Sequence, residues 1–165
     1  MKIGMIQMEA AAGNVEYNIS HGFKLMEEAA SSSDMVVLPE LWTIGYNFHD
    51  LETKTVQIGD SLIERLCNFA KFHQITLIPG TLPMKKGKHI YNTVIINKKG
   101  EIQASYSKRH LFHEYLEYEL MKPGTRLMVT EIDGIQCGMG ICFELYFHKM
   151  FRKMSNKGVT LVIVP

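Results

Sequence analysis

The sequence lacks several features that mark particular classes of protein. It has three cysteines in 165 residues, which is too few for the disulfide framework of a small secreted domain. Its 18 Lys and Arg are balanced by 17 Asp and Glu, for a formal net charge of +1, whereas a nucleic-acid-binding domain normally carries a basic face. We therefore expect a small-molecule partner and no nucleic acid.

Long apolar segments are also missing. The N-terminus reads directly as a strand, without the cationic segment, extended apolar core and cleavage site of a signal peptide. The run Val159–Val164 is far shorter than the roughly 20 residues that span a bilayer. We expect a cytoplasmic protein that contacts no membrane. A composition of 46% hydrophobic and 21% charged residues is typical of a soluble globular protein, and the length suits one domain.

Short apolar runs alternate with helical patterns along the chain. Three of these runs are predicted as strands covered on both faces: Met35–Leu38, Ile75–Ile78 and Val159–Val164. Asn14 is predicted to cap a helix that runs to about Ser32, and Ser61 with Glu64 to form the capping box of a second helix. This alternation of strands and helices favours a layered α/β arrangement.

The middle of the chain predicts an antiparallel hairpin, with strands Tyr91–Ile96 and Glu101–Lys108 joined by a turn at 97–100. Side chains alternate across a strand, so one face of the second strand should hold Ile102, Ala104, Tyr106 and Lys108. A lysine in line with buried residues needs an anionic partner, because burying an unpaired charge is costly. The alternative is that the strand has ended and Lys108 turns into solvent.

The stretch Ile135–Glu144 predicts a strand that delivers a thiol to a strand-to-helix junction. Alternation gives it one packing face, made of Ile135, Cys137, Met139 and Ile141. On the other face Gly138 and Gly140 precede Cys142, and we expect them to keep space open beside the thiol. Backbone N–H groups at such a junction favour a thiolate and a developing oxyanion. The alternative is a small cysteine that packs like any hydrophobe.

Three residues in these positions suit nucleophilic catalysis. A thiol nucleophile needs a base, and the tetrahedral intermediate needs a cation or N–H donors at its oxygen. Glu40, Lys108 and Cys142 lie where strands end, which is where ligands bind in α/β folds. They therefore form the first candidate site.

Two other chemistries have less support. His110, His113 and Glu114 have the spacing of a zinc site on a helical turn, but no clear further ligand follows. A protease-like dyad of Cys142 with a histidine is similarly weak, because nothing in the sequence fixes a particular histidine as its partner.

Three separate stretches together resemble the signature blocks of the nitrilase superfamily of carbon–nitrogen hydrolases. They are Leu38–Trp42 followed by Gly45-Tyr46, Tyr106–Phe112, and Gly140–Glu144. The blocks occur in the family's order and approximate spacing, and their wording is most similar to the ω-amidase-like branch. The resemblance implies an α/β (α+β) fold, the αββα four-layer sandwich, with residues 1–165 as a single domain incomplete at its C-terminus.

The resemblance also implies the roles of individual residues. Glu40 is the general base and later acid, Lys108 stabilises the tetrahedral intermediate, and Cys142 attacks the amide carbon to form a thioester. The backbone N–H of Phe143 completes the oxyanion site. Glu117 matches a second family glutamate, with Glu119 as the less suitable register. The candidates for the substrate pocket are Trp42, Tyr46, His110 and Glu144.

The implied reaction is hydrolysis of a small amide to ammonia and a carboxylate, with neither a metal nor an organic cofactor, in a protein that forms homodimers. Two departures from the family pattern are visible. Tyr146-Phe147-His148 stands where the family has Arg-Phe-Pro, and the sequence stops at Pro165, about halfway through the family's sandwich. The alternative is therefore a truncated, inactive family member that serves as an interaction module.

Overall fold

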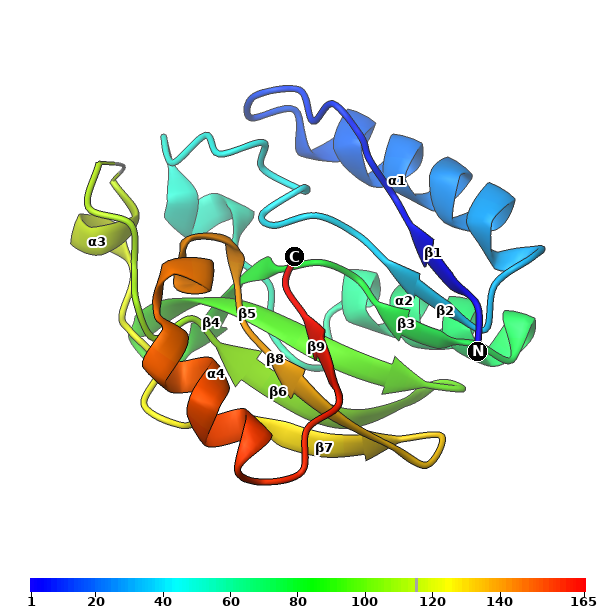
Figure 1. Ribbon diagram of the computed structural model, residues 1–165. Helices are drawn as coiled ribbons and strands as arrows, with labels where there is room; N and C mark the ends of the chain where they lie inside the picture. The colour runs from blue at the N-terminus through cyan, green and yellow to red at the C-terminus, as the bar shows by residue number, and fades with distance from the viewer. Residues whose placement is uncertain (115) are drawn as a thin grey trace.

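Figure 1 shows the computed structural model, which describes residues 1–114 and 116–165, apart from the side chains of 96 and 97. The helices are α1 (Val15–Ala30), η1 (Leu51–Lys54), α2 (Ser61–His73), α3 (Glu117–Leu120), η2 (Cys142–Tyr146) and α4 (His148–Ser155), where η denotes a 3₁₀ helix. The strands are β1 (Ile3–Met5), β2 (Met35–Val37), β3 (Thr76–Ile78), β4 (Leu82–Lys86), β5 (His89–Lys98), β6 (Glu101–Ser107), β7 (Val129–Ile132), β8 (Ile135–Met139) and β9 (Leu161–Ile163).

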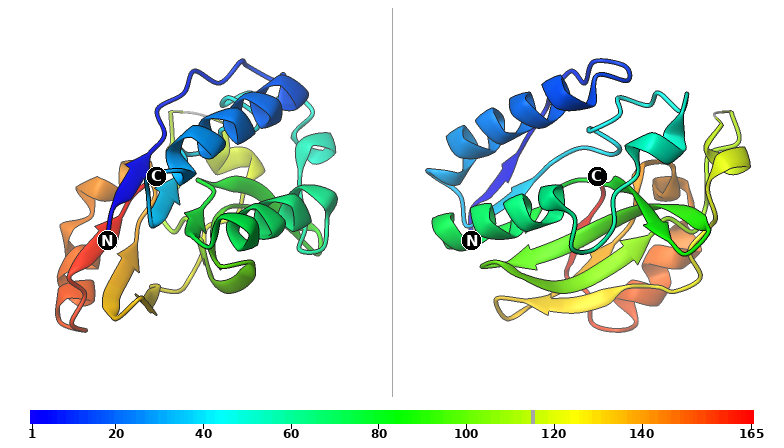
Figure 2. Two further views of the ribbon diagram at one scale, coloured as in Figure 1. Left: turned by 90° about the vertical axis from the view of Figure 1, so that its right-hand side faces the viewer. Right: turned by 180° about the vertical axis from the view of Figure 1, so that it is seen from behind.

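The strands form two sheets. In the first, the order is β1-β2-β3-β5-β4 with β6 paired to β5, and the first three strands run parallel. In the second, β8 lies between β7 and β9. Helices α1 and α2 cover the outer face of the first sheet, and α4 covers the outer face of the second (Figures 1 and 2). The predicted αββα layering is therefore confirmed.

The strands of the first sheet are apolar on both faces because each face meets a different layer. Val36 and Leu77 pack in one core with α1 and α2. Met35, Val37 and Ile78 face the other way and pack between the two sheets, against residues of β8 such as Cys137 and Met139. This arrangement explains the unbroken apolar runs of β2 and β3.

Several local predictions are confirmed. Asn14 caps α1, and its side chain accepts a hydrogen bond from the Tyr17 N–H. Ile135, Cys137, Met139 and Ile141 share one packing cluster, as the alternation predicts. Among the described residues, no helix is both long and apolar enough to cross a bilayer.

Three local predictions are wrong. Asp60, not Ser61, is the N-cap of α2, so Ser61 and Glu64 form no capping box. Ile102 is 37% exposed and does not share the face of Ala104, because β6 carries a bulge: Ile96 pairs with Ala104 but Asn97 with Ile102. One extra residue in a strand flips every side chain on one side of it.

The third error concerns Gly138 in β8 and Gly140, which follows the strand. A Cβ on Gly138 would lie 2.7 Å from the Met154 sulfur, and one on Gly140 would lie 3.2 Å from the Phe151 ring. The two glycines therefore let α4 pack closely on β8, and they do not clear space around the thiol. They still affect the site, because the chain from α4 to β9 packs on the strand that leads to Cys142.

The tightest backbone approach in the first sheet joins the loops that follow β2 and β3. Gly80 has φ +59°, and a Cβ there would lie 1.9 Å from the Pro39 carbonyl oxygen. Leu41 N–H donates to Thr81 Oγ1 (2.9 Å), and the Trp42 indole donates to the Pro79 carbonyl (2.6 Å). The loop that carries Glu40 is therefore clamped onto its neighbour.

We predict that Gly80→Ala destabilises the protein by about 3 kcal/mol or more, because a methyl group at this position must displace backbone. Gly87→Ala is the matched control: its φ is +60°, but no described atom lies within 4 Å of the added Cβ. It should cost only about 1–2 kcal/mol from the left-handed backbone. Urea unfolding measures both. Equal losses in the two variants would contradict the proposed clamp.

Candidate active site

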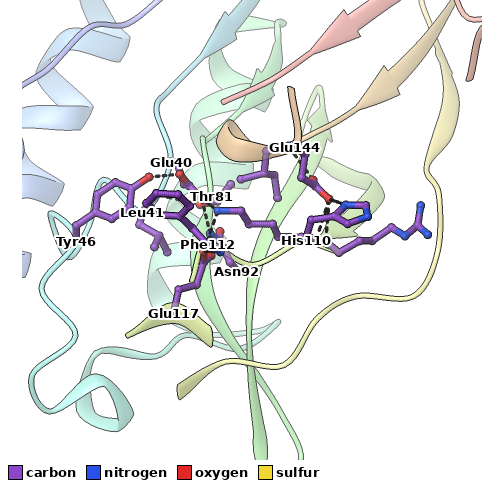
Figure 3. Close-up of polar contacts among 12 residues, drawn as sticks. Glu40, Leu41, Tyr46, Thr81, Asn92, His110, Phe112, Glu117 and Glu144 are labelled. Atoms are coloured by element: carbon purple, nitrogen blue, oxygen red, sulfur yellow. Dashed lines mark hydrogen bonds and ion pairs between the residues drawn. The ribbon is translucent and has the colours of Figure 1, made fainter. Parts of the chain in front are cut away.

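Lys108 is the buried centre of the site. Its side chain is 1% exposed, and its ammonium donates to Glu40 Oε1 (2.7 Å) and to Glu117 Oε2 (2.9 Å) (Figure 3). Burial alone opposes the charge, but the two carboxylates outweigh it and raise the pKa of Lys108 above its ordinary value of 10.5. The inward orientation predicted from the alternation is confirmed, and the solvent-facing alternative is wrong.

Glu117 occupies the position expected of a second glutamate. It is the first residue of α3 and is 1% exposed, and it also accepts a hydrogen bond from the Phe112 N–H (2.9 Å). Glu119, two residues further along the chain, is exposed and lines a different hollow, near His49. The structure thus brings Glu40, Lys108 and Glu117 into contact.

Asn92 on β5 is part of the same cluster, and the sequence reasoning missed it. Its amide nitrogen donates to Glu40 Oε1 and to Glu117 Oε1, both at 2.6 Å (Figure 3). Among the described residues its buried Oδ1 has no hydrogen-bond partner, which costs about 1–3 kcal/mol. No sequence signal marked it, because only the bulge in β6 brings Asn92 opposite Lys108, where the Lys108 N–H bonds to the Asn92 carbonyl (2.8 Å).

Cys142 lies at the predicted strand-to-helix junction. It is exposed, has φ +43°, and begins η2, while its own N–H donates to the Pro165 carbonyl (2.8 Å). Burial of its sulfur raises the pKa of the Cys142 thiol, the Glu40 carboxylate raises it further, and Lys108 and the Tyr46 hydroxyl oppose this. The thiol is therefore protonated at neutral pH and needs a base to become a nucleophile.

The Glu40 carboxylate, the Lys108 ammonium and the Cys142 thiol border one cavity of about 620 Å³. Its lining residues are Glu40, Tyr46, Lys108, Phe112, Cys142, Phe143, Leu145 and Tyr146. The Tyr46 hydroxyl donates to Glu40 Oε2 and also contacts the Cys142 thiol. Most of its lining side chains are aromatic or aliphatic. Phe143 follows Cys142 directly. The first hydrogen bond of the 3₁₀ helix η2 runs from the Glu144 N–H to the Ile141 carbonyl, so it does not use the Phe143 N–H.

Of the four expected pocket residues, only Tyr46 lines this cavity. Trp42 is 1% exposed and belongs to the helix-covered core, where its indole is bonded to backbone. His110 lies over the Phe147 ring with a centroid separation of 3.7 Å and lines a neighbouring hollow. Glu144 is fully buried. The expectation that Trp42, His110 and Glu144 line this cavity is therefore wrong.

Glu144 instead joins the segment that carries Lys108 to the segment that carries Cys142. Its carboxylate accepts hydrogen bonds from the Tyr106 hydroxyl (2.8 Å), from the N–H groups of Arg109 (3.0 Å) and His110 (3.2 Å), and from the Ile141 N–H (3.0 Å). These donors come from the end of β6 and from the residue before Cys142. The carboxylate therefore fixes the segment that carries Lys108 against the segment that carries the thiol.

The alternative metal site does not form from the proposed ligands. His110 Nδ1 lies 3.1 Å from Glu144 Oε1, whereas the His113 ring lies against Tyr118. Across residues 1–114 and 116–165, no group of three or more His, Cys, Asp or Glu is arranged to hold a metal ion.

The profile of the carbon–nitrogen hydrolase family matches residues 2–165. A curated relative is the 2-oxoglutaramate amidase of Bacillus subtilis, which is 30% identical over 98% of this chain and 63% of its own length. The chain belongs to the carbon–nitrogen hydrolase family, and the resemblance to the nitrilase superfamily and its ω-amidase-like branch is confirmed.

Solved structures agree with this assignment. Saccharomyces cerevisiae Nit3, a member of branch 10 of the nitrilase superfamily, superimposes with a TM-score of 0.87 at 27% identity over all of this chain and 64% of its own. A glutamate-to-glutamine mutant of the amidase from Nesterenkonia sp. AN1, with acrylamide added at its active-site cysteine, gives 0.85 at 26% identity over all of this chain and 66% of its own. The chain thus spans about two thirds of the length of these proteins.

We predict that Lys108→Met destabilises the fold by about 3–5 kcal/mol at pH 7, because two buried carboxylates lose their counterion. The loss should shrink as the pH falls, since the carboxyl groups then become neutral. In the unaltered protein the raised pKa of Lys108 means that its ion pairs contribute fully below pH 10.5, as long as the two carboxyl groups are ionised, and are lost as the pH rises through the folded-state pKa.

Urea unfolding at several pH values measures this effect, and Lys85→Met is its control. Lys85 pairs with Glu52 at 2.5 Å, but both side chains are partly exposed, so its loss should cost no more than about 1 kcal/mol. If the Lys108 variant were as stable as the Lys85 variant, the buried ion cluster would not be the stabilising centre.

We predict that Glu144→Gln destabilises the protein by about 2 kcal/mol or more. The side-chain NH₂ group of the glutamine would face backbone N–H groups that now donate to the carboxylate, and these donors would lose their acceptor. The exposed Glu119→Gln should leave the unfolding midpoint unchanged. Thermal and urea unfolding measure both variants. A neutral effect of Glu144→Gln would show that this carboxylate does not join the two segments.

Proposed function

We propose that the protein hydrolyses the carbon–nitrogen bond of a small amide through a thioester on Cys142. The observation that carries this proposal is the shared cavity: a protonated thiol, a carboxylate and a buried ammonium border one hollow lined by apolar side chains. The known relatives add support, since the relative from Bacillus subtilis is a 2-oxoglutaramate amidase. The whole reaction is a proposal for this chain, because it spans less than two thirds of that relative.

In the first half of the reaction Glu40 takes the proton from the Cys142 thiol as the sulfur attacks the amide carbon. The carbonyl electron pair moves to oxygen, and the resulting oxyanion is stabilised by the Lys108 ammonium and the Phe143 N–H. Glu40 then returns its proton to the nitrogen as the carbon–nitrogen bond breaks and ammonia leaves. The acyl group remains on Cys142 as a thioester.

In the second half Glu40 removes a proton from water, whose oxygen attacks the thioester carbon. The carbon–sulfur bond then breaks, the carboxylic acid is released, and Glu40 returns the proton to the sulfur. Glu117 takes no proton in this scheme and holds Lys108 in place. The balance is one amide and one water giving one carboxylic acid and one ammonia.

The substrate class that we propose is a small ω-amide, such as the monoamide of a dicarboxylic acid. The described lining contains no cation other than Lys108, and that lysine is already paired with two carboxylates. A panel should therefore compare each monoamide with a neutral amide of equal length. Clear preference for the neutral amide would contradict the ω-amide class and leave the thiol mechanism intact.

We predict that Cys142→Ala and Glu40→Gln each lower ammonia release by about a thousandfold or more, as expected when a nucleophile or its base is removed. Cys67→Ala, which changes a thiol on α2 outside the cavity lining, should keep full activity. Ammonia release from amides and nitriles measures all three. Activity that survives Cys142→Ala would end the proposal.

A thiol-labelling measurement separates loss of the base from loss of the thiol. Because the Glu40 carboxylate helps to raise the pKa of Cys142, Glu40→Gln should not slow alkylation of Cys142 by iodoacetamide at neutral pH, even though it stops hydrolysis. An inactive family member that only binds partners would show no ammonia release in the unaltered protein or in any variant.

A further inference from the structure

The two oxygens of the Glu40 carboxylate have different surroundings. Oε1 accepts from the Lys108 ammonium (2.7 Å) and from the Asn92 amide (2.6 Å). Oε2 accepts from the Tyr46 hydroxyl, which also contacts the Cys142 thiol. A carboxylate oxygen has two lone pairs, so the two donors fill Oε1, and Oε2 keeps one lone pair on the side of the thiol.

Asn92 closes a ring of hydrogen bonds around Lys108. Its second amide hydrogen goes to Glu117 Oε1 at 2.6 Å, and Glu117 Oε2 accepts from Lys108 at 2.9 Å. All four side chains belong to buried residues. The orientation of the amide is fixed by its surroundings, because the flipped amide would place its oxygen against two carboxylate oxygens.

The choice of a neutral amide at this position follows from the charges. Two carboxylates and one ammonium leave the ring with one negative charge, which is the charge that a base needs. A second cation would cancel it, whereas an amide supplies two donors and adds no charge. Asn92 therefore gives each buried carboxylate a hydrogen-bond donor without adding a charge.

We propose that Asn92 is a positioning residue that restricts proton transfer at Glu40 to one carboxylate oxygen, Oε2. This inference rests on the proposed function. In proton transfer the S–H bond of Cys142 breaks and an O–H bond forms at Glu40 Oε2, because Oε1 is filled by Lys108 and Asn92. The same oxygen then returns the proton to the leaving nitrogen. Asn92 is not among the residues that line the cavity, so we assign it no direct contact with the reacting atoms.

The direct test is the titration of Glu40 itself, which requires no turnover. Carbon-13 NMR of glutamate-labelled protein follows the Glu40 carboxyl, identified by the signal that Glu40→Gln removes. Asn92→Asp has the same shape but loses both amide hydrogens and brings a third carboxyl group, so it should move the Glu40 midpoint upward by about one pH unit or more. An unchanged midpoint in this folded variant would overturn the proposal.

Thr93→Val is the matched control. Thr93 is the next residue on β5 and equally buried, and its hydroxyl lies 2.8 Å from the Ser107 hydroxyl. Its side chain points to the other side of the strand. It should leave the Glu40 midpoint where it is in the unaltered protein. A shift as large as that of Asn92→Asp would show that any disturbance of β5 suffices, and it would overturn the role of Asn92.

Kinetics give a second readout. Asn92→Ser, a smaller variant that keeps one donor, should lower kcat about tenfold to a hundredfold, change KM less than about threefold and move the acidic limb of the kcat/KM profile upward. A fall in activity with an unmoved limb would indicate a structural role only. If the unaltered protein released no ammonia, the proposed function would fail while the Glu40 titration still decided the role of Asn92.

The unaltered protein also tests the proposal without any substitution. The side-chain N–H resonances of Asn92 should shift with the same midpoint as the Glu40 carboxyl, because one group donates to the other. Asn92 resonances that do not respond to the Glu40 titration would overturn the proposal even if no variant at this position folds.

Discussion

The structure depends on an ammonium placed between two carboxylates in the interior. Lys108 meets Glu40, which lies 68 residues away in the sequence, and Glu117, which lies nine residues away. Burying any one of these charges alone would be strongly unfavourable, so the three segments that carry them are stable only together. The cluster therefore determines how the loop after β2, the end of β6 and the start of α3 meet.

A further buried carboxylate, Glu144, explains why the thiol is placed where it is. Cys142 begins η2 with a backbone in the left-handed region, and Glu144, two residues later, accepts hydrogen bonds from the backbone next to Lys108. The segment with the nucleophile and the segment with the cation are thus fixed to each other by one buried carboxylate. The pocket is formed by loops, but each loop is tied to a rigid neighbour.

Much of this could be predicted from the sequence. Alternation across β6 placed Lys108 inside, and the ends of apolar strands marked Glu40 and Cys142, because strand geometry follows directly from residue type and spacing. The family resemblance also pointed to Glu117 rather than Glu119, and Glu117 is the one that contacts Lys108. The layered fold also followed, since both-sided apolar strands and amphipathic helices allow few arrangements.

The rest depended on details that no short pattern specifies. In a hairpin with a two-residue turn and no bulge, the register that pairs Lys98 with Glu101 would also pair Tyr91 with Lys108. The bulge in β6 shifts this register by one residue, so Asn92 lies opposite Lys108 instead. Trp42 and Glu144 were expected in the pocket because they belong to the family blocks that hold Glu40 and Cys142. Each lies two residues further along a turn or a 3₁₀ helix and is buried away from the cavity lining, so membership of a family block does not place a side chain in the cavity.

The central claim is that a carboxylate, an ammonium and a thiol act together in this cavity, and that the Cys142 sulfur forms the covalent bond to the substrate. The most direct measurement is mass spectrometry of acid-quenched protein during turnover of a small amide. The account predicts an acyl group on the peptide that contains Cys142, which disappears in Cys142→Ala. Ammonia release with no acylated Cys142, or with the acyl group on another residue, would contradict it.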